Sequence, residues 1–212
     1  MKEEIYEKII CFLSFLGIAL ASGCEYNSLS SLDSSINEVG SQNNITYNAV
    51  SISYKTYETA KELVDASNVI VSGKVTGLDF GVMDTNNNQI ATDKTAPHDK
   101  EIYTIYTIEV ISHYKYIKDE VPVKLNLWIE GGFKDRYVEE QIEALGGSGA
   151  ITISFTRPEI EVGETYLFSL QTKNGIDAYV MNAEQSIINM SNLQNTDQFG
   201  WFTAKDIIDC FE

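Results

Sequence analysis

The chain has little positive charge. Its 212 residues include 31 acidic and 15 basic side chains, so the formal net charge at pH 7 is -16. Such a field repels phosphate backbones and anionic lipid headgroups, which argues against nucleic-acid binding and against electrostatic adsorption to membranes. Cationic partners and divalent metal ions remain compatible with it. The simplest interpretation is that the charge keeps an exported protein soluble.

Residues suited to metal binding or nucleophilic catalysis are also scarce. Only two histidines occur, His98 and His113, and neither has a second histidine or a cysteine at ligand spacing, so zinc is not expected. Nothing marks out a Ser-His-Asp triad. The run Gly-Gly-Ser-Gly-Ala at 146–150 lacks the strand-turn-helix context of a nucleophile elbow, and we interpret it as a loop.

No apolar run is long enough to span a membrane permanently. The stretch from Ile9 to Ala21 has the length of a signal-peptide core, well short of the roughly 20 residues that cross a bilayer. Small residues follow, and then Cys24. This Ala-Ser-Gly-Cys motif resembles the lipobox of bacterial lipoproteins, which implies a signal peptide at 1–23 and a lipidated Cys24. The alternative is an uncleaved apolar helix with an incidental cysteine.

The shortage of cysteine excludes a disulfide framework. Of the three cysteines, Cys11 would be lost with the signal peptide and Cys24 would carry lipid, which leaves Cys210 alone. An extracellular protein without disulfides fits a Gram-positive surface better than a eukaryotic secretory route. A diacylglycerol group supplies the two chains that stable anchoring requires. We therefore expect a lipid-anchored protein on the extracellular face of the cell membrane.

Composition divides the mature chain into a tether and a domain. Residues 24–52 are mostly Ser, Asn and small side chains, which predicts a flexible tether. Residues 53–212 carry enough apolar side chains to form a core, and no internal repeat appears. Helical spacing of apolar residues predicts short helices at about 56–66 and within 135–145. Thr203-Ala204-Lys205-Asp206 indicates a third helix start, with Ile207, Ile208 and Cys210 available to pack.

Strand patterns fill most of the domain. We predict strands at 68–80, with a bend or bulge at Gly73 or Gly77, and at 101–116. The polar residues 81–100 between them predict a long loop. Further strands are predicted at 121–129, at 150–155 and on both sides of an Asn174-Gly175 hairpin turn. In the strand 121–129, alternation places Val121, Val123, Leu125, Leu127 and Ile129 inward and Lys124, Asn126 and Trp128 outward.

The order of these pieces resembles a pattern in uncharacterised Firmicute lipoproteins. ELVDASNVIVSGKVTGL is followed by YTIYTIEVISHYKYIKDEVPVKLNLWIEGG and then by VGETYLFSL. The pattern is also similar, more remotely, to the netrin-like module of tissue inhibitors of metalloproteinases. The resemblance implies a mainly β (α+β) fold, a small OB-like closed or partly open antiparallel β-barrel with short flanking helices. Residues 133–155 are interpreted as an insertion.

The inhibitory mechanism of those proteins is not carried over. The inhibitors coordinate a protease zinc through a free N-terminal cysteine and hold their barrel with disulfides. Here Cys24 would be acylated, and no disulfide is available to the mature domain. The resemblance therefore implies a fold and no reaction.

One polar stretch matches part of a calcium-binding loop. Asp84, Asn86 and Asn88 occupy its first three ligand positions, where hard oxygen atoms converge. Gln89 replaces the glycine of the sharp turn, and Thr95 replaces the bidentate glutamate. An Asn-rich turn whose side chains cap their own backbone explains the pattern better. Apart from this Ca²⁺ candidate, no cofactor is expected.

Aromatic residues are the remaining candidates for ligand binding. Trp128 is predicted on the outward face of its strand, and Tyr103, Tyr114 and Tyr116 are predicted to share an exposed sheet surface. OB-fold barrels bind oligosaccharides or extended chains across such a face by stacking. The alternative is that the helix at 56–66 or the insertion covers Trp128.

Three functions from different classes fit these features. The first is a surface-anchored, non-catalytic binding module for a protein or glycan, favoured by the missing catalytic constellation. The second is a cell-envelope hydrolase, which needs a cleft with convergent carboxylates or a perturbed histidine. The third is an accessory or immunity lipoprotein that works in a complex. An exposed aromatic strip would support the first, a polar pocket the second, and a flat apolar patch the third.

Overall fold

The computed structural model describes residues 46–116, 120–147, 150–154, 157–173, 176–180 and 182–212. All of them belong to the unit Val39–Glu212. The expected signal peptide, Cys24 and the first part of the expected tether fall outside the described residues. Residues 148–149 of the Gly-Gly-Ser-Gly-Ala run and the Asn174-Gly175 turn also fall outside them.

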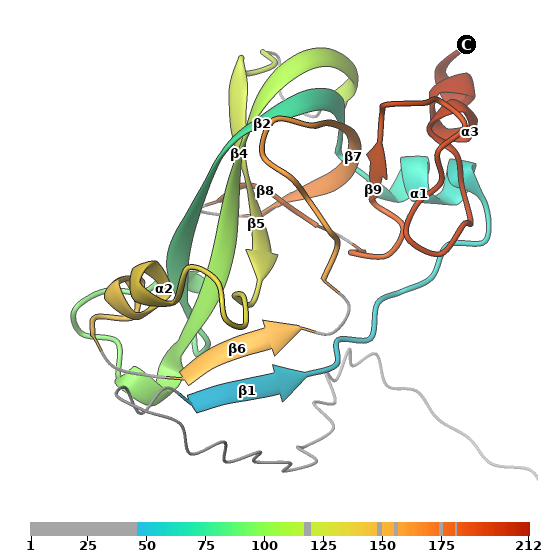
Figure 1. Ribbon diagram of the computed structural model, residues 1–212. Helices are drawn as coiled ribbons and strands as arrows, with labels where there is room; N and C mark the ends of the chain where they lie inside the picture. The colour runs from blue at the N-terminus through green and yellow to red at the C-terminus, as the bar shows by residue number, and fades with distance from the viewer. Residues whose placement is uncertain (1–45, 117–119, 148–149, 155–156, 174–175, 181) are drawn as a thin grey trace, which may run out of the picture. The chain divides into compact units, whose positions relative to one another are not determined.

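The described chain is mainly β, with most of its strands in one sheet (Figure 1). In chain order these strands are β2 (Val69–Asp84), β3 (Gln89–Ile90), β4 (Lys100–Tyr116), β5 (Lys124–Glu130), β7 (Thr165–Lys173), β8 (Ile176–Val180) and β9 (Ile187–Asn189). β2 and β4 pair along almost their entire length. β5 pairs with β4, and β7 pairs antiparallel with both β8 and β9, as the hairpin prediction requires for β7 and β8.

Strand β2 joins two parts of the sheet. Its first half, Val69 to Lys74, pairs with β4 along one edge and with β7 along the other. β5 also pairs with β8 in parallel, whereas the other pairs of this sheet are antiparallel. Each strand in the series β2, β4, β5, β8 and β7 therefore pairs with the next, and β7 pairs with β2 again. The register of β2 shifts beside Gly73 and Gly77, which confirms the predicted bulges.

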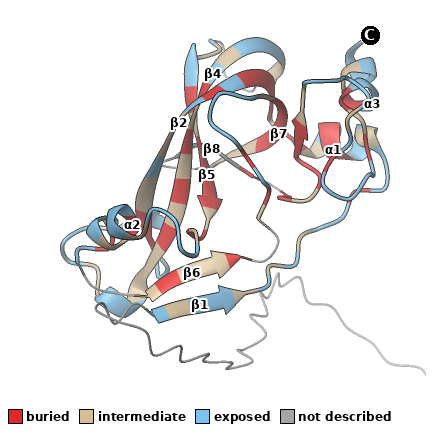
Figure 2. Cartoon of the chain, viewed as in Figure 1, coloured by how far each residue is buried: buried red, intermediate tan, exposed pale blue. Residues whose placement is uncertain are grey.

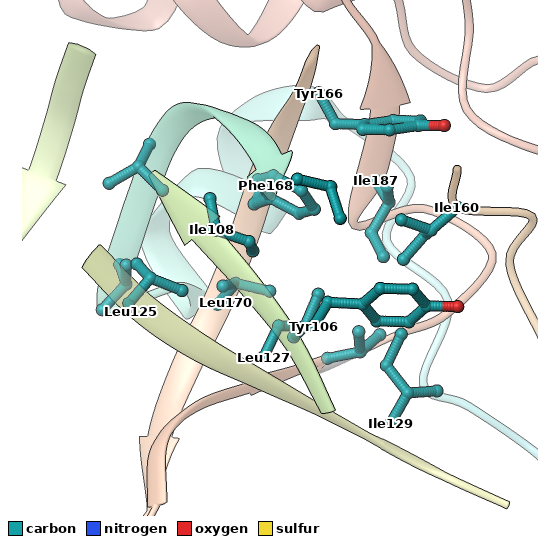
Figure 3. Close-up of a cluster of buried hydrophobic side chains, with 14 of the residues drawn as sticks. Tyr106, Ile108, Leu125, Leu127, Ile129, Ile160, Tyr166, Phe168, Leu170 and Ile187 are labelled. Carbon is teal, nitrogen blue, oxygen red and sulfur yellow. The ribbon is translucent and has the colours of Figure 1, made fainter. Parts of the chain in front are cut away.

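The largest core cluster lies between these strands (Figure 3). Alternate residues of β2, β4, β5 and β7 enter it, including Tyr106 and Ile108 from β4 and Leu127 from β5. The hydroxyl groups of Tyr106 and Tyr166 point to the same side of the cluster, where Ile160 lies between them (Figure 3). Each hydroxyl binds the segment 157–161: Arg157 Nη2 donates to Tyr106 at 3.0 Å, and the Glu161 amide donates to Tyr166 at 3.0 Å. Both tyrosines thus combine core packing with a satisfied polar tip.

A second cluster covers the other side of β2 and β7. Helix α1 (Ala60–Ala66) contributes Leu63 and Val64, and helix α3 (Ala204–Ile208) contributes Ile207. Figure 1 shows α1 and α3 grouped together next to β9, an edge strand of the sheet. The Thr59 hydroxyl accepts from the Glu62 amide at the start of α1, and α3 begins with a capping box, as its sequence predicts. Helices this short depend on packing for their stability.

A third cluster joins a smaller sheet to the lower end of β2 and β4. Strand β1 (Thr46–Val50) pairs in parallel with β6 (Ala150–Ser154), and α2 (Val138–Ala144) lies beside them. Residues 46–50 were expected to belong to the flexible tether. That expectation is wrong for them, because their backbone groups pair with β6. Helix α2 ends at Ala144 with Leu145 as its C-cap, and Gly146 and Gly147 follow at positive φ, as predicted.

Several predicted boundaries require correction. The helix expected at 56–66 begins only at Ala60, and the first long strand continues to Asp84, so the loop 81–100 is shorter than expected. It contains β3 and a 3₁₀ turn, η1 (Pro97–Asp99), before β4 begins at Lys100. The strand expected at 121–129 begins at Lys124, and Val123 is 75% exposed instead of inward.

The burial pattern agrees with this arrangement (Figure 2). Buried positions follow the strands, whereas α2 and the C-terminal 3₁₀ turn η2 (Asp209–Phe211) are mainly exposed. Cys210, which was expected to be available for packing, lies in η2 and is exposed. Among the described residues, no helix has the length and apolarity to cross a bilayer.

Candidate functional site

The structure brings two of the predicted aromatic residues together. Tyr103 on β4 and Trp128 on β5 have ring centroids 6.2 Å apart, on the sheet face opposite the core. Trp128 lies on the outward face of its strand, as predicted, but it is only 9% exposed, so its indole is covered and does not offer the exposed stacking surface that ligand binding requires. The physical reason is Gly81 on β2, since a Cβ there would lie 2.7 Å from the indole ring. The absent side chain leaves the space that the indole fills.

Tyr114 lies elsewhere. Its ring centroid is 5.9 Å from that of Phe211, and it packs against the cluster formed by α1 and α3. Eleven residues of extended chain separate it from Tyr103, a distance on the order of 35 Å. The prediction that Tyr103 and Tyr114 share one surface is therefore wrong. Tyr116, at the end of β4, borders a recess at the C-terminal end of α1.

Two carboxyl groups lie on the same face as the Tyr103–Trp128 pair. Glu101 and Glu130 are each two residues from one of these aromatics, so strand alternation directs them to the same side. Partial burial, followed by the charge of Glu130 and a hydrogen bond with it, raises the pKa of Glu101 to about 7. The pair can hold a proton between two carboxyl groups near neutral pH. The sequence offers no signal for it, because the partners come from different strands.

The recess beside α1 has a volume of about 320 Å³ and is lined by Asp65–Asn68, Lys115 and Tyr116. The ammonium group of Lys115 already forms hydrogen bonds within the protein. Its Nζ donates to the carbonyl oxygens of Val64 at 2.8 Å and of Asp65 at 3.3 Å. A lysine that caps the end of a helix has a structural role. The recess therefore does not provide the polar catalytic pocket that a hydrolase needs.

The calcium candidate forms a turn whose key carboxylate is occupied. Asp84 Oδ1 accepts from the Asn86 amide at 2.9 Å, and Oδ2 accepts from Thr95 Oγ1 at 3.0 Å and from Asn87 Nδ2 at 3.2 Å. Asn88 adopts φ of 55° within this turn. Donor groups pointing at both oxygens leave little room for a cation. Side chains capping their own backbone, the alternative stated above, account for the motif.

Neither histidine forms part of a cluster. His98 and His113 are both exposed, and His98 Nε2 lies 3.6 Å from Asp99 Oδ2. Across the described stretches of the chain, no three His, Cys, Asp or Glu side chains are arranged to hold a metal ion.

The structure reveals an aromatic loop that sequence reasoning missed. Between β9 and α3, the side chains of Phe199 and Trp201 are 55% and 51% exposed. The loop is held from beneath by Asp197, which is 4% exposed and accepts three backbone N–H groups at 3.0 Å, those of Phe199, Trp201 and Phe202. The signal that could have indicated it is the Asp-Gln-Phe-Gly-Trp sequence, an aspartate followed by aromatics around a glycine.

Comparison with known proteins adds no relatives. No model of a known protein family matches the chain, and no curated protein matches it either.

Proposed function

We propose that this protein is a lipid-anchored, non-catalytic binding module of the cell surface. The N-terminal apolar stretch, the small residues after it and Cys24 support the anchor. Cys24 would carry the diacylglycerol group, and the residues that follow would hold the domain away from the membrane. The domain would then bind a protein or a glycan outside the cell.

An OB-like barrel is the fold that we propose for this domain. The return of strand pairing from β7 to β2 supports it, as does the parallel pairing of β5 with β8. Helix α2 lies in the chain between the third and fourth strands of this ring, together with β6. A five-stranded, partly open barrel with Greek-key connections is the arrangement of OB-folds, many of which bind oligomeric ligands.

The binding proposal depends most on two exposed aromatic side chains, Phe199 and Trp201, in a loop whose backbone is hydrogen-bonded to Asp197. Large aromatic side chains are normally buried, and an exposed one contributes much contact area at low cost in side-chain entropy. The three hydrogen bonds to Asp197 hold the loop in one conformation before any ligand arrives. A pre-ordered loop loses less entropy on binding than a mobile one.

The carboxyl pair does not favour the hydrolase. Glycosidases need their two carboxyl groups about 5 to 9.5 Å apart, so that substrate and water fit between them. Glu101 and Glu130 hydrogen-bond to each other instead. Their geometry suits proton sharing within the sheet face.

Metabolic labelling tests the anchor. A Gram-positive host expressing the full chain is fed an alkyne fatty acid, and the wild type is compared with Cys24→Ser and with the matched control Cys210→Ser. We expect label on the wild type and on the control, and its loss in Cys24→Ser together with release of the protein from the membrane. Equal labelling of all three proteins would contradict the anchor.

Sedimentation with isolated cell envelopes tests the binding role. The full chain is used with Cys24→Ser, so that lipid does not contribute, and is compared with the same chain carrying Trp201→Ala or Ile90→Ala. Ile90 is exposed to a similar extent on β3, at 52%. Loss of one stacked aromatic should weaken envelope binding about tenfold, whereas Ile90→Ala should not. Unchanged binding by the Trp201 variant would contradict a binding role for this loop.

A further inference from the structure

We propose that the Phe199-Gly200-Trp201 loop is a binding site for neutral oligosaccharides. This inference depends on the proposed binding function and names its ligand class. The site consists of the two aromatic side chains, the exposed amide side chain of Gln198 next to Phe199 in the chain, and that of Gln194, five residues before Phe199.

The backbone that carries the two aromatic side chains is held by hydrogen bonds. Asp197 Oδ1 accepts the amides of Phe199 and Trp201, and Oδ2 accepts that of Phe202. Gly200 between the aromatics has φ of +76°, a conformation that favours glycine. Phe202 turns into the cluster of α1 and α3, where it is buried. The backbone is thus fixed on both sides of Trp201 while the indole stays exposed.

The charge of the loop selects among ligand classes. In a chain of net charge -16, residues 191–203 contain one ionisable side chain, Asp197, and it is buried with both oxygens accepting N–H groups. No cation is available there to bind phosphate, which disfavours nucleic acids and anionic lipids. The remaining polar groups are neutral amides and hydroxyls.

Neutral amides and exposed aromatic rings in one short segment match the chemistry of a sugar. The C–H face of a pyranose ring can stack on an indole, as apolar groups generally do on aromatics. Its hydroxyl groups both donate and accept hydrogen bonds, as an amide side chain does. Within the described part of the chain, no hydrogen bond engages the side-chain amides of Gln194 or Gln198, so both are free to bind hydroxyl groups.

The test is a fluorescence titration of the full chain carrying Cys24→Ser. The probes are chitohexaose, cellohexaose and maltohexaose, with phosphatidylcholine vesicles as a separate arm. Trp128 is buried and Trp201 exposed, so the emission change on binding should come from Trp201. We expect at least one sugar to bind, with a shift of the emission maximum to shorter wavelength. In Trp201→Phe the emission change should disappear, while calorimetry should still detect weakened sugar binding. This result would show that Trp201 reports the binding.

Affinity of the variants completes the test. Trp201→Ala should weaken sugar binding about tenfold or more and Phe199→Ala several-fold, whereas the exposed control Ile90→Ala should bind as the wild type does. All three changes are at exposed side chains, and urea unfolding should give wild-type midpoints. Equal sugar affinity of wild type and Trp201→Ala would overturn the proposal.

Three further outcomes separate this inference from the binding function itself. If none of the sugars binds up to about 10 mM but Trp201→Ala still reduces envelope sedimentation, the ligand class is wrong and the binding function stands. If vesicles bind in a Trp201-dependent way and sugars do not, the loop contacts lipid instead. If sugars, vesicles and envelopes all fail to bind, both proposals are wrong.

Discussion

The indole of Trp128 lies over the backbone of Gly81, two strands away across the sheet. The two residues flank Ile105 of β4, which pairs directly with Trp128. A Cβ at position 81 would come within 2.7 Å of the indole ring and 2.8 Å of Ile105 Cδ1. This close contact shows that the indole packs directly against the strand backbone at Gly81, where any side chain would occupy its place.

The first prediction concerns this contact. Gly81→Ala should lower the free energy of unfolding by about 1 to 3 kcal/mol, because the new methyl group displaces the indole or the strand. Urea unfolding followed by Trp fluorescence measures the effect. Gly77→Ala, on the same strand, is the matched control, since its Cβ would meet Thr107 at an ordinary 3.6 Å. Equal destabilisation by both substitutions would show that backbone effects, and not the indole contact, matter at position 81.

The second prediction concerns pH. The folded state raises the pKa of Glu101 from 4.5 to about 7, so it binds a proton more tightly than the unfolded chain does. The associated stability is present below pH 4.5 and is lost as pH rises through 7. Glu101→Gln should therefore leave stability at pH 4 unchanged and raise it at pH 8. After allowance for solvent screening, the gain is on the order of 1 kcal/mol.

Urea unfolding at pH 4, 6 and 8 measures this dependence. Glu109→Gln is the control, because Glu109 is an exposed glutamate on the same strand. Its substitution should have little effect at any of these pH values. A Glu101→Gln variant that is less stable than the wild type at pH 8 would show that the carboxylate is needed in its charged form.

The third prediction concerns the clamp beneath the aromatic loop. Asp197→Ala should cost about 2 to 4 kcal/mol of stability, because three backbone N–H groups lose a buried, charged acceptor. Asp197→Asn should cost less, since its amide oxygen can still accept the bonds made by Oδ1. Thermal unfolding of both variants, beside Asp209→Asn at an exposed site, gives the comparison. If Asp197→Ala loses no more stability than Asp209→Asn does, the hydrogen bonds to Asp197 do not stabilise the loop.

The fourth prediction concerns calcium. Because hydrogen-bond donors occupy both oxygens of Asp84, millimolar Ca²⁺ should raise the melting temperature no more than Mg²⁺ does, and EDTA should not lower it. Asp84→Ala should cost about 0.5 to 1.5 kcal/mol through loss of the turn bonds, equally with and without Ca²⁺. A Ca²⁺-specific stabilisation that Asp84→Ala abolishes would establish a metal site.

Local sequence signals predicted the elements that depend on neighbouring residues. Alternation along β4 predicted its buried face through Ile102, Tyr106 and Ile108. The Thr203–Asp206 pair predicted the start of α3, and two glycines predicted the end of α2. In each case the deciding groups lie within a few residues of one another. The parallel pairing of residues 46–50 with β6 could not be predicted, because its partner lies about a hundred residues further along the chain.

The candidate sites follow the same division. The polar and aromatic residues at 197–201 are visible in the sequence, but their exposure depends on Asp197 accepting three N–H groups beneath them. Tyr103 and Trp128 were correctly assigned to the face opposite the core. Their proximity and the burial of the indole required β2 to place Gly81 beside them.

The sequence by itself determined the strand and helix periods, the caps and the strong acidic charge, because these depend on residue type and short spacing. The export signal stays a prediction from the same kind of local pattern. Only the tertiary structure decided which outward side chains are covered, which carboxyl groups lie close enough to raise a pKa and which aromatics remain exposed. Burial and proton affinity depend on groups that folding brings together from distant parts of the chain. Here Gly81, Glu130 and Asp197 each determine the environment of residues that no local pattern connects to them.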